Sequence, residues 1–224
     1  MTRDIFDAWT IPASVEVPGA TSAALGTEFS VRSLSIDPRW LNGLADILIE
    51  GSSRLRKRKA ADLAQILGIA GSRFLKEGDP FRTKALELLP RASGLSAPMA
   101  RAVLDGMAAD WVEDRLRGLL NNEFGTSDTL DGFVKQNGCQ TMAIGADLCV
   151  QIVSGSVPGV GVTALIRSLL TKAPTLLKPG RGDVVLPVLF MQALAVIDQD
   201  LAENVAVLYW PGGSSDLERG VLDR

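Results

Sequence analysis

The topology of this chain is decided by residues 147–210, which read DLCVQIVSGSVPGVGVTALIRSLLTKAPTLLKPGRGDVVLPVLFMQALAVIDQDLAENVAVLYW. Short apolar runs bounded by glycine or proline alternate here with longer apolar segments of helical length. We therefore expect two helices, at 162–171 and 184–197, between three strands, at Asp147–Val153, Pro174–Leu177 and Asn204–Leu208. Parallel strands joined by right-handed helical crossovers form half of a doubly wound sheet, so the expected fold class is α/β.

Ligands of doubly wound sheets bind at the carboxyl ends of the strands. Those ends lead into three loops, Ser154–Gly161, Lys178–Asp183 and Trp210–Ser215. The first loop has a GxxxGxG spacing, at Gly155, Gly159 and Gly161, and also contains Pro158. Its amides and the following helix N-terminus could face a bound anion. Glycine is equally typical of a tight strand-to-helix turn, so the spacing leaves both interpretations open.

Lys178 is the strongest single candidate for ligand binding. It ends an apolar strand and precedes Pro179, which predicts that its ammonium lies in the ligand crevice. The alternative is a surface lysine whose stem lies along the strand end and whose charge is in water. Tyr209 and Trp210 end the third strand, where they either wall a flat ligand pocket or cover the sheet against another part of the protein.

The chain before this stretch divides into two further regions. Residues 37–125 have helical periodicity, with N-caps at Asp37, Asp79 and Ser96 and a further helix from about Leu55 to Lys76. The helix from Ser96 is expected to extend to about residue 120, and a glycine at 125 closes the region. Residues 1–36 are expected to be irregular, with one short strand at most, at Ser14–Val17. The expected divisions are therefore 1–36, 37–125 and 126–224.

Composition excludes several classes of function. The net charge of −3 provides no general attraction to nucleic acid or to an anionic membrane. The basic run Arg54–Lys59 lacks the aromatic residues that stack on bases, so it is predicted to be a solvated helix face. Because the chain has no histidine, Ser-His-Asp and Cys-His catalysis and histidine-ligated zinc are excluded within it, and no metal site is expected. No membrane span or signal peptide is recognisable, so a cytoplasmic location is expected.

The motifs VPG, LLKP, LPVLF and VLYWPGG occur together in residues 157–213. With the preceding helical segment, ALELLPRASGLSAPMARAVLDGMAADWVEDRLRGLLNNEFG, they make residues 37–218 resemble the LuxC-type fatty acyl-CoA reductases, a branch of the aldehyde dehydrogenase superfamily. The resemblance implies an aldehyde-dehydrogenase-like fold and reduction of a fatty acyl thioester, from acyl-CoA or an acyl carrier, to an aldehyde. The acyl group would pass to a cysteine before NADPH, or alternatively NADH, supplies hydride.

The resemblance also implies roles for particular residues. Lys178 would contact the adenine-side ribose or its phosphate, and Arg181 the extra phosphate of NADPH. The cofactor-binding set would be completed by Pro179, Gly180, Gly155 and Pro158. Ser156 takes the place of an asparagine that helps to form the oxyanion hole. Loss of one such donor typically lowers the rate by roughly 100- to 1,000-fold.

Two departures from the family bear on activity. Gly180 stands where serine or alanine often follows the Lys-Pro pair, and the family's nucleophilic cysteine lies beyond the YWPGG stretch. Cys149 is expected within the first strand and Cys139 in an exposed polar loop, and neither is predicted to be catalytic.

Three hypotheses follow: a reductase lacking its second half, a nucleotide-binding or interaction module without chemistry, and a regulatory or structural scaffold. The third strand is predicted to be an exposed edge, so self-association or a missing C-terminal half is the expected partner.

Overall fold

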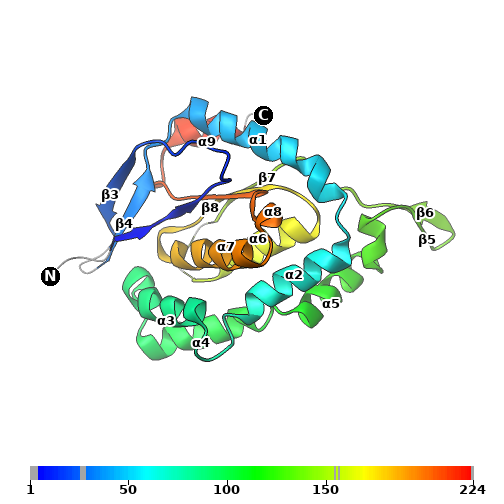
Figure 1. The fold of residues 1–224 in the computed structure, drawn as a ribbon, viewed down its shortest axis with the longest axis horizontal. Helices are drawn as coiled ribbons and strands as arrows, with labels where there is room; N and C mark the ends of the chain where they lie inside the picture. The colour runs from blue at the N-terminus through cyan, green and yellow to red at the C-terminus, as the bar shows by residue number, and fades with distance from the viewer. Residues whose placement is uncertain (1–4, 26–28, 154, 156, 223–224) are drawn as a thin grey trace.

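The computed structural model describes residues 5–25, 29–153, 155 and 157–222 and centres on a four-stranded sheet (Figure 1). The strand order is β2 (Trp9–Thr10), β9 (Val205–Leu208), β8 (Thr175–Lys178) and β7 (Cys149–Ile152). β7, β8 and β9 are parallel, and β2 pairs antiparallel with β9. The predicted strand–helix–strand–helix–strand order and the α/β fold class are confirmed.

Helices cover both faces of this sheet. On one face pack the two crossover helices, α6 (Val160–Leu170) and α7 (Val185–Ile197), and the short α8 (Gln199–Ala202) follows α7. On the other face lie α1 (Pro38–Arg56) and α9 (Ser215–Leu222). Alternate residues of β8 serve the two cores, since Leu177 packs with α6 and α7 and Leu176 with α1.

The remaining helices form an outer layer against α6 and α7. They are α2 (Ala60–Ser72), α3 (Pro80–Ser93), α4 (Ala97–Ala108) and α5 (Glu113–Phe124). The predicted caps are confirmed: Asp37, Asp79 and Ser96 accept hydrogen bonds from amides in the first turns of α1, α3 and α4. The single helix expected from Ser96 to residue 120 is two, because the chain breaks before Glu113 and buries Trp111 at the break.

The basic run Arg54–Lys59 is the junction between α1 and α2 and not one helix face. Arg56 donates to the carbonyl of Gly145 and forms an ion pair with Asp147. Arg58 forms an ion pair with Asp198. The run therefore ties the helical layer to the loops before β7 and after α7, so its charges are partly neutralised within the protein.

The N-terminal region contains more strand than its sequence predicts. A small sheet has the order β1 (Ile5–Asp7), β4 (Ser30–Leu34), β3 (Ala20–Ala24), and β2 joins the central sheet. The strand expected at Ser14–Val17 is wrong, because these residues form a turn and loop.

A hairpin projects from the body at the right of Figure 1. It follows the 3-10 turn η1 (Ser127–Leu130) and pairs β5 (Val134–Gln136) with β6 (Cys139–Thr141). Its turn uses positive φ values at Asn137 and Gly138.

The open edge of the central sheet is β7 and not the third strand. Two strands, β2 and β8, flank β9, and all four residues of β9 are buried. β7 pairs only with β8 among the described strands, and Ile152 at its end is 43% exposed. The expectation of an exposed third strand is therefore wrong, because a two-residue segment from the far N-terminus covers that edge.

Candidate functional site

The carboxyl ends of β7 and β8 lie side by side, so the first two predicted loops start from neighbouring positions. Ile152 is in register with Lys178, and the amide of Val153 donates to the carbonyl of Lys178 at 2.9 Å. Gly180 then packs directly on the first loop, where a Cβ at this position would lie less than 3.0 Å from the carbonyl oxygen of Gly155. The structure therefore brings together Gly155, Lys178 and Gly180 at one edge of the sheet.

Lys178 is buried at the end of β8, with 8% of its surface exposed. Its ammonium lies 5.6 Å from the centre of the Trp210 ring, a cation–π arrangement. Burial lowers the pKa of Lys178, and the charge of Glu218 on α9 opposes this shift. Within the described part of the chain this ammonium has no hydrogen bond or salt bridge, so it is a desolvated cation with free donors.

Trp210 adds a second unused donor beside this lysine. The residue is 5% exposed, and its buried indole Nε1 has no hydrogen-bond partner among the described residues. Buried donors are normally paired, so this edge of the sheet holds an unpaired indole N–H beside a desolvated ammonium.

The N-terminus of α6 is already occupied by a side chain of the protein. The Asp183 carboxylate accepts the amides of Gly159 and Gly161, each at 2.7 Å, from the loop after β8. Asp183 is 1% exposed, and burial raises its pKa to about 7 although the two amides act in the opposite direction. The amides that the glycine spacing offered to a bound anion are therefore used internally.

The other predicted residues have mixed positions. Pro158 and Pro179 are buried and shape the two loops, whereas Arg181 is exposed. The charge of Arg181 acts on the hydroxyl of Tyr209 and lowers its pKa against the larger raising effect of burial. Arg181 is thus an available cation at the rim of the same edge. Ser156 lies outside the described residues.

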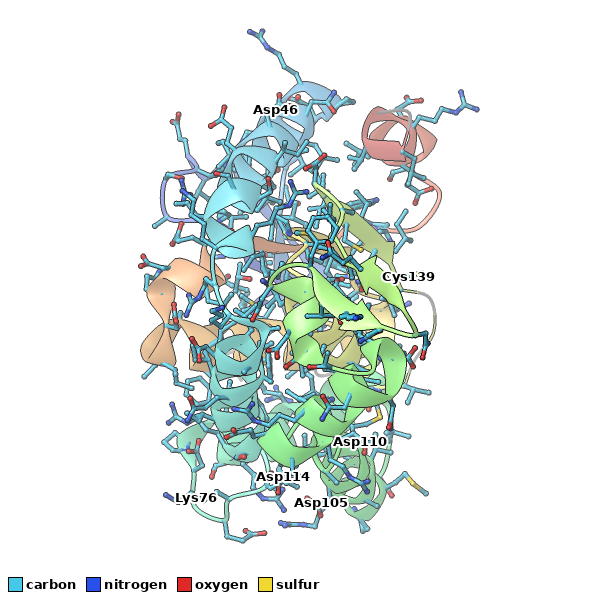
Figure 2. All side chains as sticks on the ribbon, turned by 90° about the vertical axis from the view of Figure 1, so that its right-hand side faces the viewer. Asp46, Lys76, Asp105, Asp110, Asp114 and Cys139 are labelled. Atoms are coloured by element: carbon cyan, nitrogen blue, oxygen red, sulfur yellow. The ribbon has the colours of Figure 1, made fainter. Side chains whose placement is uncertain are left out.

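Neither cysteine lies at this edge in a catalytic arrangement. Cys139 is exposed on β6, and Figure 2 shows it well away from the acidic group Asp105, Asp110 and Asp114 at one end of the molecule. Cys149 is half-buried in β7, as predicted. Among the described residues no group of three or more acidic or cysteine side chains is arranged to hold a metal ion.

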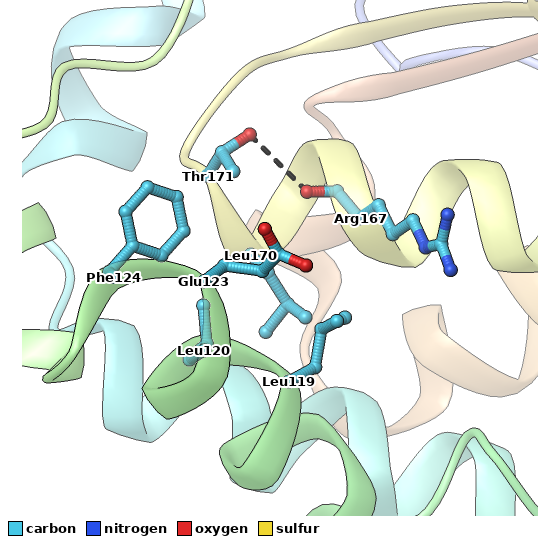
Figure 3. Close-up of a pocket in the computed structure, with 7 residues that line it drawn as sticks. All are labelled: Leu119, Leu120, Glu123, Phe124, Arg167, Leu170 and Thr171. Atoms are coloured by element: carbon cyan, nitrogen blue, oxygen red, sulfur yellow. Dashed lines mark hydrogen bonds between the residues drawn. The ribbon is translucent and has the colours of Figure 1, made fainter.

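Sequence reasoning missed a groove between α5 and α6. Two adjoining cavities of about 350 and 360 Å³ share Leu119 and Arg167 in their walls. Figure 3 shows the first, which is lined by Leu119, Leu120, Glu123, Phe124, Arg167, Leu170 and Thr171. The second reaches Thr163, whose hydroxyl accepts the Trp111 indole N–H at 3.0 Å. The leucines of α5 were the available signal, but their spacing is also that of an ordinary core-facing helix.

Comparison with known proteins identifies the family. A family model described as Acyl-CoA reductase (LuxC) matches residues 59–224. The chain belongs to the LuxC acyl-CoA reductase family. A long-chain acyl-protein thioester reductase from Aliivibrio fischeri is 23% identical to this LuxC-family chain over 182 residues, which are 76% of this chain and 37% of that protein. The corresponding protein from Photobacterium phosphoreum is 24% identical over 156 residues, which are 66% of this chain and 31% of that protein.

Solved structures confirm the aldehyde-dehydrogenase-like fold of the LuxC-family chain. A salicylaldehyde dehydrogenase from Pseudomonas putida superimposes with a TM-score of 0.66 at 12% identity, covering 97% of this chain and 44% of its own. A 3,6-anhydro-L-galactose dehydrogenase in complex with NAP gives 0.68 at 12% identity, covering 99% and 45%. The LuxC-family chain spans about a third of the length of the curated relatives it matches. Within its described part, none of the helices is both long and apolar enough to cross a membrane.

Proposed function

We propose that this chain is the nucleotide-binding part of a reductase that converts a fatty acyl thioester to an aldehyde with NADPH. The observation that carries the proposal is Lys178, a desolvated ammonium without a hydrogen-bonding partner among the described residues, at the carboxyl edge of a doubly wound sheet. The family's description as acyl-CoA reductase supplies the reaction class.

The residues present at this edge fit a dinucleotide. Lys178 and the Trp210 indole N–H are buried donors that ribose hydroxyls or phosphate oxygens would satisfy. The exposed guanidinium of Arg181 would pair with the additional phosphate of NADPH, so we favour NADPH over NADH. Gly155, Pro158, Pro179 and Gly180 complete the proposed cofactor site by shaping the two loops.

The cofactor would supply hydride, and the chain's own residues would bind and orient it. A substrate thioester, from acyl-CoA or an acyl carrier, would place its hydrocarbon in the groove between α5 and α6. That groove runs from Thr163, one turn into α6, to Thr171 beyond its end. Leucines and Phe124 line its apolar part, and charged side chains, among them Glu123 and Arg167, line the remainder. We retain Ser156 as the proposed oxyanion donor.

The acyl-accepting cysteine is proposed to lie in the part of the relatives that this chain does not match. Cys139 is on the projecting hairpin and Cys149 is in β7, so neither is positioned by the three loops. The chain alone is therefore expected to bind nucleotide without reducing a thioester. The alternative is a non-catalytic nucleotide-binding or interaction module. The desolvated ammonium of Lys178 would favour this alternative if the chain acts without a cysteine-bearing second half.

The open edge of β7 is the proposed surface for a partner. In the doubly wound order 3-2-1-4-5-6, the fourth strand pairs with the first. Here β9, β8 and β7 take the places of strands 3, 2 and 1, so the next parallel strand would pair with β7. We propose that the rest of the reductase provides this strand, and that the isolated chain self-associates through the same edge.

Calorimetric titration with NADPH tests the nucleotide site. Lys178→Met removes the ammonium but keeps an apolar stem, and Lys135→Met is a matched control because Lys135 is exposed on the distant hairpin. A hydrogen bond from a charged donor contributes about 1.5–3 kcal/mol, so Lys178→Met should weaken binding by roughly ten-fold or more. Equal affinities of wild type and Lys178→Met would refute the proposed site, and so would the absence of binding to wild type.

A further inference from the structure

Asp183 connects two of the loops that form the proposed site. It lies at the end of the β8–α7 loop, in the turn η2 (Arg181–Asp183), whereas its two hydrogen bonds go to the β7–α6 loop. One carboxylate oxygen accepts the amide of Gly159 and the other the amide of Gly161. Gly159 is the N-cap of α6 and has no side chain, so Asp183, 24 residues further along the chain, takes the place of a local capping side chain.

This arrangement requires the ionised form of the carboxyl group. An ionised carboxylate accepts hydrogen bonds on both oxygens, whereas a protonated one has an O–H donor on one of them. Protonation of Asp183 would therefore place its O–H donor against one of the two amide N–H donors, at a contact that is now 2.7 Å. One of the two amides would then lose its partner inside a buried site, and the loop would have to move to satisfy it.

The surroundings of Asp183 leave its charge without a compensating cation. The helices α6 and α7 that pack on it carry one charged residue, Arg167, at the far end of α6. Its own loop carries Lys178 and Arg181, and α3, which contacts η2, carries Arg82, Lys84, Glu87 and Arg91. None of these charges contributes to its pKa, which burial raises to about 7 against the effect of the two amides.

We propose that Asp183 is a positioning residue that holds the β7–α6 loop against the β8–α7 loop, and that loss of its charge releases this contact and weakens nucleotide binding. The second half of this inference rests on the proposed nucleotide site. The loop that moves carries Gly155, against which Gly180 packs, and Gly180 is two residues from Lys178. Any shift of the first loop is therefore transmitted to the segment that places the ammonium.

The first experiment observes the contact itself, without a nucleotide. In the chain labelled with ¹⁵N-glycine, the amide signals of Gly159 and Gly161 should move together as the pH is lowered through neutrality. Asp183→Asn should abolish this titration, and Asp37→Asn should leave it intact, because Asp37 is an exposed N-cap of α1. Carboxylates with ordinary pKa values do not titrate between roughly pH 5 and pH 8. If the two glycine signals do not move within this range, the charge-dependent contact is refuted. The wild-type titration decides this even if the variant fails to fold.

The second experiment measures NADPH affinity of the chain at several pH values. Wild type should bind more weakly on the acid side of neutrality, and Asp183→Asn should bind roughly ten-fold more weakly than wild type at alkaline pH and lose this acid dependence. If the glycine signals titrate but wild-type affinity stays constant, the positioning role is wrong although the nucleotide site stands. If the signals titrate and no NADPH binds at any pH, the proposed function fails while the contact is confirmed.

Discussion

Replacing Gly180 with alanine tests whether the two loops are as closely packed as the structure indicates. The backbone at Gly180 has φ −70° and ψ 162°, which alanine adopts readily, so backbone strain is not the issue. The added Cβ would lie less than 3.0 Å from the carbonyl oxygen of Gly155 and 3.2 Å from the Gly155 nitrogen and the Val153 oxygen. Ordinary carbon–oxygen contacts are about 3.3–3.6 Å, and all three neighbours are backbone atoms. The first loop must therefore move.

The expected magnitude follows from this overlap. Inserting a methyl group into a filled site typically costs about 1–3 kcal/mol. For a chain of this size each kcal/mol lowers Tm by about 2–4 °C, so Gly180→Ala should lower Tm by about 2–12 °C. Because the moving loop adjoins Lys178, NADPH affinity should fall as well.

The assay is thermal unfolding followed by circular dichroism, with Gly106→Ala as the matched control. Gly106 is exposed in α4, and a Cβ there would have no neighbour within 4 Å. Alanine in a helix is more stable than glycine by about 0.5–1 kcal/mol, so this control should raise Tm slightly. A Gly180→Ala variant that unfolds at or above the wild-type temperature would refute the close packing of the two loops.

Three further predictions concern other sites. Lys172 is 3% exposed and forms a 2.6 Å ion pair with Asp131, so Lys172→Met should destabilise the chain by about 3–5 kcal/mol in denaturant unfolding; a loss below about 1 kcal/mol would contradict this. Because burial lowers the pKa of Lys178, its ammonium should lose its proton, and NADPH affinity should fall, at a lower pH than for an ordinary lysine. Between the lowered pKa and the ordinary lysine pKa the unfolded chain binds more protons than the folded chain, so the free energy of unfolding should rise with pH. Calorimetry and denaturation at several pH values measure the two trends, and an NADPH affinity that stays constant up to the ordinary lysine pKa would contradict the first. Ile152→Lys places a charge on the open edge of β7, so light scattering should show less self-association than for wild type, and a sharp monomeric peak for wild type would contradict the open-edge argument.

Local signals in the sequence predicted most of the α/β core correctly. Asp-Pro pairs mark the starts of α1 and α3, and short apolar runs close to glycine or proline mark β7, β8 and β9. These features act within a few residues of one another, so periodicity and capping residues suffice to recognise them.

Long-range pairings account for what the sequence did not predict. The antiparallel pairing of Trp9–Thr10 with β9 joins segments nearly 200 residues apart. A strand of two residues has no sequence pattern from which its partner could be predicted. The same applies to Asp183, which reads as an ordinary loop aspartate until the fold brings it to the amides of Gly159 and Gly161. The division into residues 1–36, 37–125 and 126–224 stays a prediction.

At the proposed site, the candidate residues could be named from the sequence, whereas their burial and their contacts required the structure. Lys178 was predicted from its place at a strand end, and its burial beside Trp210 became visible only in three dimensions. For the glycine loop the spacing left an anion site and a tight turn both open, and the structure shows that the amides of Gly159 and Gly161 are satisfied within the protein.

The most direct test of the nucleotide site is energy transfer from Trp210 to bound NADPH. Trp210 lies against the Lys178 ammonium, so excitation of tryptophan should produce sensitised nicotinamide emission in the wild-type chain. The chain has four tryptophans, so the comparison uses Lys178→Met and Lys135→Met, which keep all of them. Our account predicts that at a sub-saturating NADPH concentration this emission is reduced in Lys178→Met but unchanged in Lys135→Met. Sensitised emission that persists undiminished in Lys178→Met at the same NADPH concentration would show that the nucleotide binds elsewhere and would contradict the account.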